Sequence, residues 1–415
     1  MNTEVKPRLR PIDASPLTLQ GKEYLLLQDR TGLAPLSYIP RAWAPIVALF
    51  DGSRNLSEIV GSYSLNGGQM LPIDFLEHIV AQMDEAYLLD SPRFAAYYQA
   101  TVDEFEVSPV RLAAFAGKSF PAEPDELKDL LTSFFSEASK LNQQQSSFEP
   151  AALRGIMVPH IDFTRGGPVE ALAYQQLLEQ KFDVYVVLGI AHSGVRYPFC
   201  ATAKDYDTPF GPARTDVAFV QALEDRVGER FTAEQFTHKN EHSIEFVAVF
   251  LQAMTSTKDS RIVPILCGGF HDDVRSGRSP SRNPDIAAFC VALREVVDEW
   301  EARGKRVGFI ASVDLSHVGS RFGDDATITP QRLAAIEVAD RDFLHCAELG
   351  SAEALHNHIA RDANARNVDA HPALYTLLTA FPELRGQVLH YAQTFDDEAN
   401  SLVSFASMAL FAGYG

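Results

Sequence analysis

Apolar runs of strand length recur along the chain, and they end at side chains that can bind a metal or a proton. The runs span residues 155–160, 183–194, 261–269 and 307–317 and carry His160, His192, Cys267, Asp314 and His317 at or near their ends. Helical patterns alternate with these runs, which predicts an α/β fold with a mostly parallel central sheet and helices on both faces. Because ligands bind at the carboxyl ends of parallel strands, we expect the strand-end side chains to converge in one cleft.

The first part of the chain has a different pattern. Residues 18–92 combine short strand signals with three short helical segments, which predicts a small winged-helix α+β domain over residues 1–95. Asp74 is the expected N-cap of the third helix. Residues 96–150 are expected to form a linker and the leading helix of the main α/β domain, which occupies residues 151–415.

Composition narrows the function classes. The chain has 415 residues with 36 Lys+Arg and 55 Asp+Glu, and its net charge of -19 disfavours binding to nucleic acid. Its four cysteines contain no CxxC pair, which argues against a zinc knuckle or a disulfide framework and favours buried thiols. Since we find neither an apolar run of membrane-spanning length nor a signal peptide, we expect a cytoplasmic protein that does not bind membranes.

Histidines at strand ends are the strongest candidates for chemistry. His160 and His192 are expected to bind a metal, because neutral imidazoles gathered at one edge of a sheet are a common metal site. Asp314 and His317 lie three residues apart after a strand, so that one can orient the other. The histidines that do not lie at the end of a predicted central strand are expected to have ordinary structural roles. These are His78, His345, His356, His358 and His390.

The segment 240–245 reads as the start of a helix. Asn240 is its expected N-cap and His242 lies in the first turn, where the helix dipole lowers the pKa of an imidazole. Glu241 and Glu245 are expected only to cap the first turn.

Nine short segments in a fixed order resemble a known family. They cover residues 115–121, 158–160, 188–192, 208–210, 241–245, 262–268, 312–319, 371–372 and 391–393. Together they resemble the Memo family, which includes the bacterial AmmeMemoRadiSam system protein B. Its fold is similar to that of class III extradiol ring-cleaving dioxygenases. Residues 49–59 resemble the PqqD-like winged-helix modules. The resemblance implies either a peptide or protein partner for the N-terminal domain or a purely structural role, and DNA binding ranks last.

The resemblance also implies a site. His160 and His192 correspond to the metal-binding histidines of the family, and the same pocket is lined by His242, Asp314 and His317. In the animal proteins a cysteine lies three residues before the His-Pro pair, and Val368 takes that position here. This departure leaves the identity of the third ligand open.

Asp369 is the candidate replacement, because a carboxylate with two histidines is a ligand set suited to ferrous iron. Alternatives stay open at this point: His371 is the third ligand, Asp369 is only a loop cap, or the site binds no metal.

These features favour a metal-dependent oxidoreductase that acts on a small molecule, with Fe(II) preferred over Cu or Zn. The candidate catalytic groups are His317, His242 and Asp314. The alternative is a non-catalytic accessory protein that works with a radical-SAM enzyme and an AMMECR-domain protein, as the family resemblance implies. Metal-dependent hydrolysis is a third reading of the same residues.

Overall fold

The computed structural model describes residues 4–65, 70–141, 153–324, 326–397 and 399–413. The chain divides into two compact units, Met1–Val107 and Ser108–Gly415. This division falls inside residues 96–150, which the sequence pattern assigns to a linker and leading helix. Residues 142–150 of that segment lie outside the described residues.

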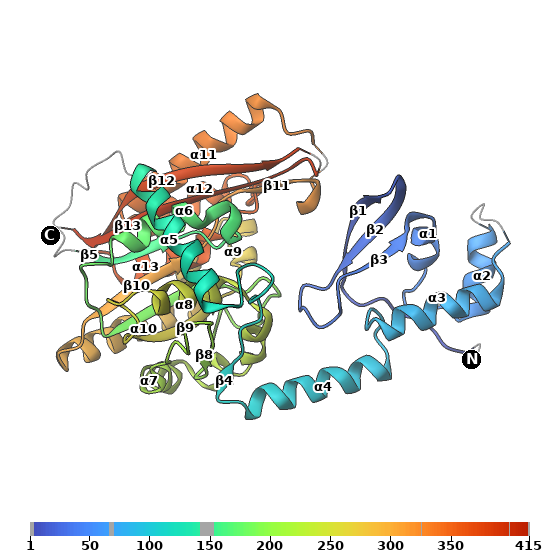
Figure 1. The fold of residues 1–415 in the computed structure, drawn as a ribbon, viewed down its shortest axis with the longest axis horizontal. Helices are drawn as coiled ribbons and strands as arrows, with labels where there is room; N and C mark the ends of the chain where they lie inside the picture. The colour runs from blue at the N-terminus through green and yellow to red at the C-terminus, as the bar shows by residue number, and fades with distance from the viewer. Residues whose placement is uncertain (1–3, 66–69, 142–152, 325, 398, 414–415) are drawn as a thin grey trace. The chain divides into compact units, whose positions relative to one another are not determined.

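The N-terminal unit combines a small antiparallel sheet with helices (Figure 1). Its strands are β1 (Asp13–Leu19), β2 (Lys22–Gln28) and β3 (Ser37–Pro40), with β2 in the middle. Its helices are α1 (Ala44–Val47), α2 (Leu56–Leu65), α3 (Ile73–Glu85) and α4 (Pro92–Val107). The N-cap of α3 is Pro72 and not Asp74, which lies in the first turn. The fixed φ of proline suits the extended backbone of an N-cap.

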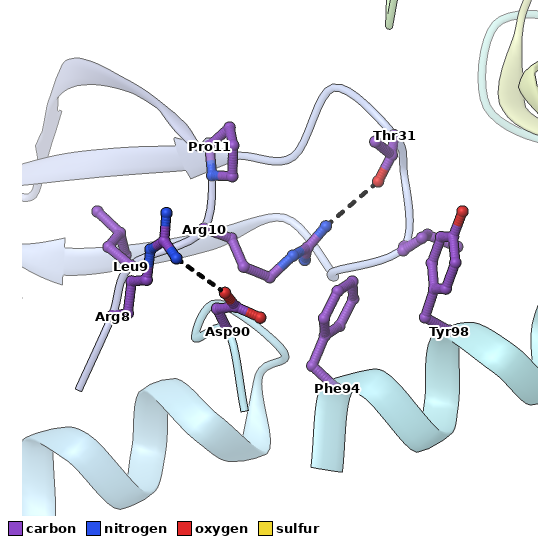
Figure 2. Close-up of a pocket in the computed structure, with 9 residues that line it drawn as sticks. Arg8, Leu9, Arg10, Pro11, Thr31, Asp90, Phe94 and Tyr98 are labelled. Atoms are coloured by element: carbon purple, nitrogen blue, oxygen red, sulfur yellow. Dashed lines mark hydrogen bonds and ion pairs between the residues drawn. The ribbon is translucent and has the colours of Figure 1, made fainter. Parts of the chain in front are cut away.

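Figure 2 shows a hollow in this unit, between its first residues and the start of α4, with a volume of about 490 Å³. Arg10 forms part of its wall. The Arg10 guanidinium donates to the Asp29 carboxylate at 2.9 Å and to the backbone oxygen of Tyr87 at 2.6 Å, and it lies over the Phe94 ring. The Arg10 and Asp29 side chains are both buried, so this ion pair balances its charges inside the unit.

The main unit is built on a mixed sheet with the strand order β11-β13-β5-β10-β6-β9-β7, and β12 pairs with β13. The central strands run parallel and are β5 (Leu153–Val158), β10 (Val307–Ser312), β6 (Val184–Ile190) and β9 (Arg261–Cys267). The antiparallel strands beside them are β7 (Phe199–Ala201), β11 (His317–Gly319), β12 (Leu384–Asp396) and β13 (Ser401–Ala412). This sheet, with its parallel centre, confirms the predicted α/β class.

Helices cover both faces of the sheet (Figure 1). On one face pack α5 (Pro124–Leu141), α6 (Phe163–Gln175) and α8 (Ser243–Ala253). On the other pack α7 (Val217–Val227), α9 (His271–Ser276), α10 (Pro284–Ala302), α11 (Pro330–Glu348), α12 (Ala352–Ala360) and α13 (Ala370–Ala380). We call the two apolar layers the α6 layer and the α10 layer. Because strand residues alternate between faces, Val187 belongs to the first and Val186 to the second.

The start of α6 brings this helix close to the end of β5. The sequence pattern predicts a helix over residues 168–180, but α6 begins at Phe163 and contains Pro168. Gly166 permits this approach, because a Cβ there would lie 2.3 Å from Ile161 in the loop after β5. Gly167 permits the close packing of α6 on α5, because a Cβ there would lie 2.3 Å from the Phe134 ring. The loop between β5 and α6 is therefore short and tightly packed.

Among the described residues, no helix combines the length and apolar character needed to cross a membrane. Cys200, Cys267 and Cys290 are buried as free thiols, and Cys346 is partly buried. The strand-end Cys267 packs in the α10 layer.

Candidate metal centre

Histidines converge at the carboxyl ends of two central strands. His160 comes two residues after β5, His192 comes two residues after β6, and His242 directly precedes α8. The ring centroid of His160 lies 5.0 Å from that of His192 and 5.0 Å from that of His242, and the latter two are 4.7 Å apart. Each ring offers one nitrogen within 4.8 Å of the others, so the group can hold a metal ion.

Both strand-end imidazoles are oriented through Nδ1. His160 Nδ1 lies 2.9 Å from the backbone oxygen of Ser312, and His192 Nδ1 lies 3.0 and 3.1 Å from the two carboxylate oxygens of Glu241. Because these oxygens can only accept, each Nδ1 donates its proton. In the neutral ring the lone pair is then on Nε2, the arrangement in which an outer hydrogen bond prepares a histidine for a metal.

Glu241 does more than the helix capping expected from the sequence. Its carboxylate accepts the backbone N–H of Ser243 at 3.0 Å, which is a contact at the start of α8. It also accepts the backbone N–H of His192 at 3.0 Å and lies 3.3 Å from His242 Nδ1. Burial alone raises its pKa, but the charges and hydrogen bonds of these histidines outweigh burial and hold the pKa of Glu241 well below its usual range. Glu241 therefore orients two members of the group.

The helix start differs from the predicted one. Asn240 ends a short 3-10 helix (Gln235–Asn240), and the N-cap of α8 is His242 itself. Glu245 is fully buried and pairs with Arg111, and its oxygens accept the backbone N–H groups of Ala114 at 3.0 Å and Phe115 at 2.9 Å. Glu245 thus holds the segment before α5 against the start of α8.

Asp369 points its carboxylate at the same place as the histidines. Its Oδ2 lies 3.2 Å from His160 Nε2 and 3.9 Å from His192 Nε2. Asp369 occupies the N-cap position of α13, but its side chain makes no capping hydrogen bond. His160 Nε2 and Asp369 Oδ2 are buried and have no hydrogen-bond partner of suitable geometry among the described residues. Two buried ligand atoms that lie 3.2 Å apart and have no other partner among the described residues fit the ligand set of a bound metal ion.

The neighbours of Asp369 face elsewhere. Val368 is buried in the α10 layer. His371 Nε2 lies 3.1 Å from His356 Nδ1, and the His371 ring packs against Phe270. Of the two candidate third ligands, Asp369 faces the ring nitrogens of His160 and His192, whereas His371 pairs with another buried histidine.

Asp314 and His317 lie beside the group. Asp314 Oδ1 accepts the backbone N–H of His160 at 3.1 Å, and Oδ2 lies 3.9 Å from His160 Nε2. The Asp314 backbone N–H in turn donates to Asp369 Oδ1 at 2.7 Å. His317 Nδ1 lies 3.1 Å from the backbone oxygen of Leu315, so its Nδ1 donates there, and its ring is close enough to interact electrostatically with Asp314 and Asp369.

A buried hydrogen-bond network fixes the loops that carry the carboxylates. Asp340, in α11, is fully buried and accepts from Ser316 Oγ at 2.6 Å and from Arg366 Nη1 at 2.7 Å. Ser316 lies next to His317, and Arg366 lies three residues before Asp369. The Arg366 charge balances that of Asp340, so the network joins both loops to α11 without an unpaired buried charge.

The rings differ in their affinity for protons. Burial on its own lowers the pKa of His160, but the carboxylates of Asp314 and Asp369 outweigh burial and raise it to about 10. Burial, together with the charge of His192, lowers the pKa of His242 to about 3. At neutral pH the site therefore favours a positive charge at His160, where a metal cation can replace the proton.

One side of the group is open. The side chain of His160 is 2% exposed, whereas those of His192 and His242 are 37% and 28% exposed. Phe115 lies on this side, with its ring centroid 5.6 Å from that of His242. A small molecule would therefore reach the group past His192 and His242.

Comparison with known proteins places this site in a family. A family model described as Memo-like protein matches residues 111–409. A MEMO1 family protein of Aquifex aeolicus is 25% identical over 411 residues, which cover 98% of this chain and 100% of the relative. One from Thermus thermophilus is 28% identical over 355 residues, with 84% and 96% covered. One from Methanococcoides burtonii is 30% identical over 208 residues, with 50% and 68% covered. The family match includes every segment that contributes to the histidine group, and the chain belongs to the Memo family.

Proposed function

We propose that the protein is a metal-dependent oxidoreductase that acts on a small molecule, with the metal held by His160, His192 and Asp369. The observation that carries the proposal is the convergence of Asp369 Oδ2 on His160 Nε2 and His192 Nε2, at 3.2 and 3.9 Å. Support also comes from the hydrogen bonds that fix both rings through Nδ1. His242 is close enough to act as a further ligand.

Ferrous iron is the metal that we propose. Two imidazoles and one carboxylate with open positions form the ligand set of non-haem Fe(II) oxygenases, and a hard oxygen ligand disfavours cuprous copper. When bound, the ion would supply redox and Lewis-acid chemistry. A reducing cytoplasm, which is the location we propose, would also keep the free thiols of this chain reduced.

The chain's own residues then have separate roles. His242 is neutral at physiological pH, partly exposed and next to the open side, so it can donate or accept a hydrogen bond from a substrate. His317 can move a proton through Nε2, because its Nδ1 is bound to a backbone oxygen. Asp314 is buried, and its Oδ1 accepts the backbone N–H of His160. We therefore give Asp314 a role in positioning His160.

We also propose that the N-terminal unit recruits a peptide or a protein partner. The Aquifex relative matches over 98% of this chain and therefore includes this unit, and the unit contains the hollow beside Arg10. A radical-SAM enzyme and an AMMECR-domain protein are the partners to test. If the histidine group binds no metal, this accessory role becomes the main function.

Elemental analysis of protein purified without oxygen tests the proposal. We expect about one iron per chain in the wild type and none in the double variant His160→Ala/His192→Ala. His345→Ala is the matched control, because His345 is an exposed histidine of α11. A wild-type protein that is purified without metal and also fails to bind added Fe(II) would contradict the proposed oxidoreductase function and favour the accessory role.

A further inference from the structure

The segment that leads into α13 sends two adjacent side chains to different places. Val368 is 2% exposed and packs in the α10 layer. The next residue, Asp369, instead points Oδ2 at His160 Nε2, 3.2 Å away. Because adjacent side chains leave the backbone in different directions, the turn before them decides which one faces the histidine group. The residues that fix this turn therefore decide which chemical group is offered to a metal.

The side chain of Asn364 holds the backbone of Val368 through two hydrogen bonds. Its Oδ1 accepts the Val368 N–H at 2.8 Å, and its Nδ2 donates to the Val368 carbonyl oxygen at 3.0 Å. One amide thus satisfies both the donor and the acceptor of one residue, as a neighbouring strand does. With both backbone groups held, the Val368 side chain is kept in the α10 layer.

Asn367 sets the direction of the chain just before Val368. Its φ of 50° lies in the left-handed region, which asparagine adopts more readily than most residues and a β-branched residue strongly disfavours. Its Nδ2 donates to the backbone oxygen of His317 at 3.0 Å, and the His317 N–H donates to the backbone oxygen of Arg366 at 2.7 Å. The turn is therefore fastened to the loop that follows β10.

The same loop holds Asp369 and the start of α13. The Asp314 N–H donates to Asp369 Oδ1 at 2.7 Å, and the Ala370 N–H donates to the backbone oxygen of Asp314 at 3.1 Å. Oδ1 is occupied in this way, and Oδ2 is the oxygen that lies next to His160. The carboxylate is thus held in place by the metal-free protein, as a preorganised ligand requires.

We propose that Asn364 and Asn367 select the third metal ligand: they fix the backbone so that Asp369 faces the histidines and position 368 is withheld from the metal, whatever side chain it carries. Both act through Asp369 and are positioning residues. The proposal rests on the proposed function, because it gives the two asparagines a role toward the metal. If they only stabilised the loop, a good ligand placed at position 368 would be free to bind.

Val368→Cys tests this selection with Co(II) as a spectroscopic substitute for Fe(II). A thiolate binds divalent transition metals, and its bond to Co(II) gives an intense charge-transfer band in the near ultraviolet. We expect Val368→Cys to bind Co(II) without this band. In Val368→Cys/Asn364→Gly the band should appear, because glycine accepts the φ of 57° at position 364 but lacks the amide. A band in the single variant, or none in the double variant, would overturn the proposal.

Fe(II) titration of two variants at position 367 tests the turn. Asn367→Gly keeps the left-handed conformation and should bind Fe(II) like the wild type. Asn367→Val should bind about 10- to 100-fold more weakly, because valine disfavours a positive φ and Asp369 then turns away. Gln20→Val is the matched control, because Gln20 also has a φ of 50° but lies in the N-terminal unit. Wild-type affinity in Asn367→Val, or an equal loss in Asn367→Gly, would exclude selection by the turn.

Thiol labelling of the metal-free full-length protein separates this proposal from the proposed function. In Val368→Cys the new thiol should react slowly with an aromatic disulfide reagent, and adding Asn364→Gly should speed this reaction about tenfold or more, because the residue is then no longer held in the core. Val338→Cys is the positive control, because Val338 is 61% exposed in α11.

The labelling result stands without any metal. A wild type that binds neither Fe(II) nor Co(II) would contradict the oxidoreductase, and the labelling rates would still decide whether the asparagines direct position 368. A new thiol that reacts as fast as that of Val338→Cys in the single variant, or equally slowly in the single and double variants, would overturn the role of Asn364.

Discussion

Asp369 is the side chain on which the metal assignment depends most. Asp369→Asn removes the carboxylate charge and keeps the shape of the side chain. We expect the affinity for Fe(II) to fall about 100-fold, because the loss of a hydrogen-bond partner outside the ligand set already lowers metal affinity by up to about 100-fold. Fe(II) titration of the metal-free protein under nitrogen measures the effect. Asp272→Asn serves as the control, because the Asp272 side chain is 85% exposed in α9. Equal Fe(II) affinities in the two variants would remove Asp369 from the ligand set.

His160 should make metal binding depend on pH. Its pKa is raised to about 10, since the carboxylates of Asp314 and Asp369 outweigh the effect of burial, so that the metal-free ring is protonated at pH 7. Metal binding must expel that proton. Affinity should therefore rise about tenfold per pH unit above pH 7 and level off near the pKa of His160.

Calorimetry in two buffers of different ionisation enthalpy measures this proton directly. We expect release of about one proton or more per metal at pH 7. A binding enthalpy that is the same in both buffers would mean that no net proton leaves.

The sequence predicts the roles of some single site residues better than those of others. His160 and His192 could be identified because an apolar run and a strand end fix where each side chain points. Glu241 could not, because its place beside a helix start is equally typical of a simple cap. The direction of Asp369 was open as well, because it depends on a turn in which Asn367 has a φ of 50°. Asparagine adopts this left-handed conformation more readily than most non-glycine residues, but the local sequence does not require it at Asn367.

Two glutamates lie at the start of α8. Their glutamine variants should affect different properties: one the affinity for the metal, the other the stability of the fold. Glu241→Gln should weaken metal binding about 10- to 100-fold, because Glu241 orients His192 and His242. Glu245→Gln should instead lower the free energy of unfolding by about 3–5 kcal/mol, because it leaves the buried Arg111 charge without its partner.

Metal titration and denaturant unfolding, done on both variants, separate the two roles. Folded Glu245→Gln protein should still bind stoichiometric metal. If Glu241→Gln binds metal like the wild type and only loses stability, Glu241 is a helix cap as its sequence position suggests.

Elements and their order were predictable to different degrees. The alternation of apolar runs with amphipathic helices identifies β5, β6, β9 and β10 as a parallel set, because each is buried on both faces. The antiparallel hairpin of β12 and β13 beside β5 was not predictable, since strand order depends on long-range pairing. The early start of α6 places Gly166 against Ile161 and Gly167 against the Phe134 ring of α5, and such long-range packing cannot be seen in the helical pattern.

For the whole molecule, the two units make a simple prediction. A fragment of residues 108–415 should fold and bind metal like the full chain, because both apolar layers and every residue of the histidine group lie within it. Thermal unfolding and metal stoichiometry of the fragment measure this. A fragment that aggregates, or that folds but binds no metal, would show that residues 1–107 complete the main unit.

A structure of the Fe(II)-loaded protein, with the metal located by anomalous scattering, tests the central claim most directly. We predict one ion bound by His160 Nε2, His192 Nε2 and Asp369 Oδ2 at roughly 2.0–2.2 Å, the range typical of nitrogen and carboxylate ligands. An ion bound by His160, His192 and His242 with Asp369 turned away, or no ion at this site at all, would contradict it.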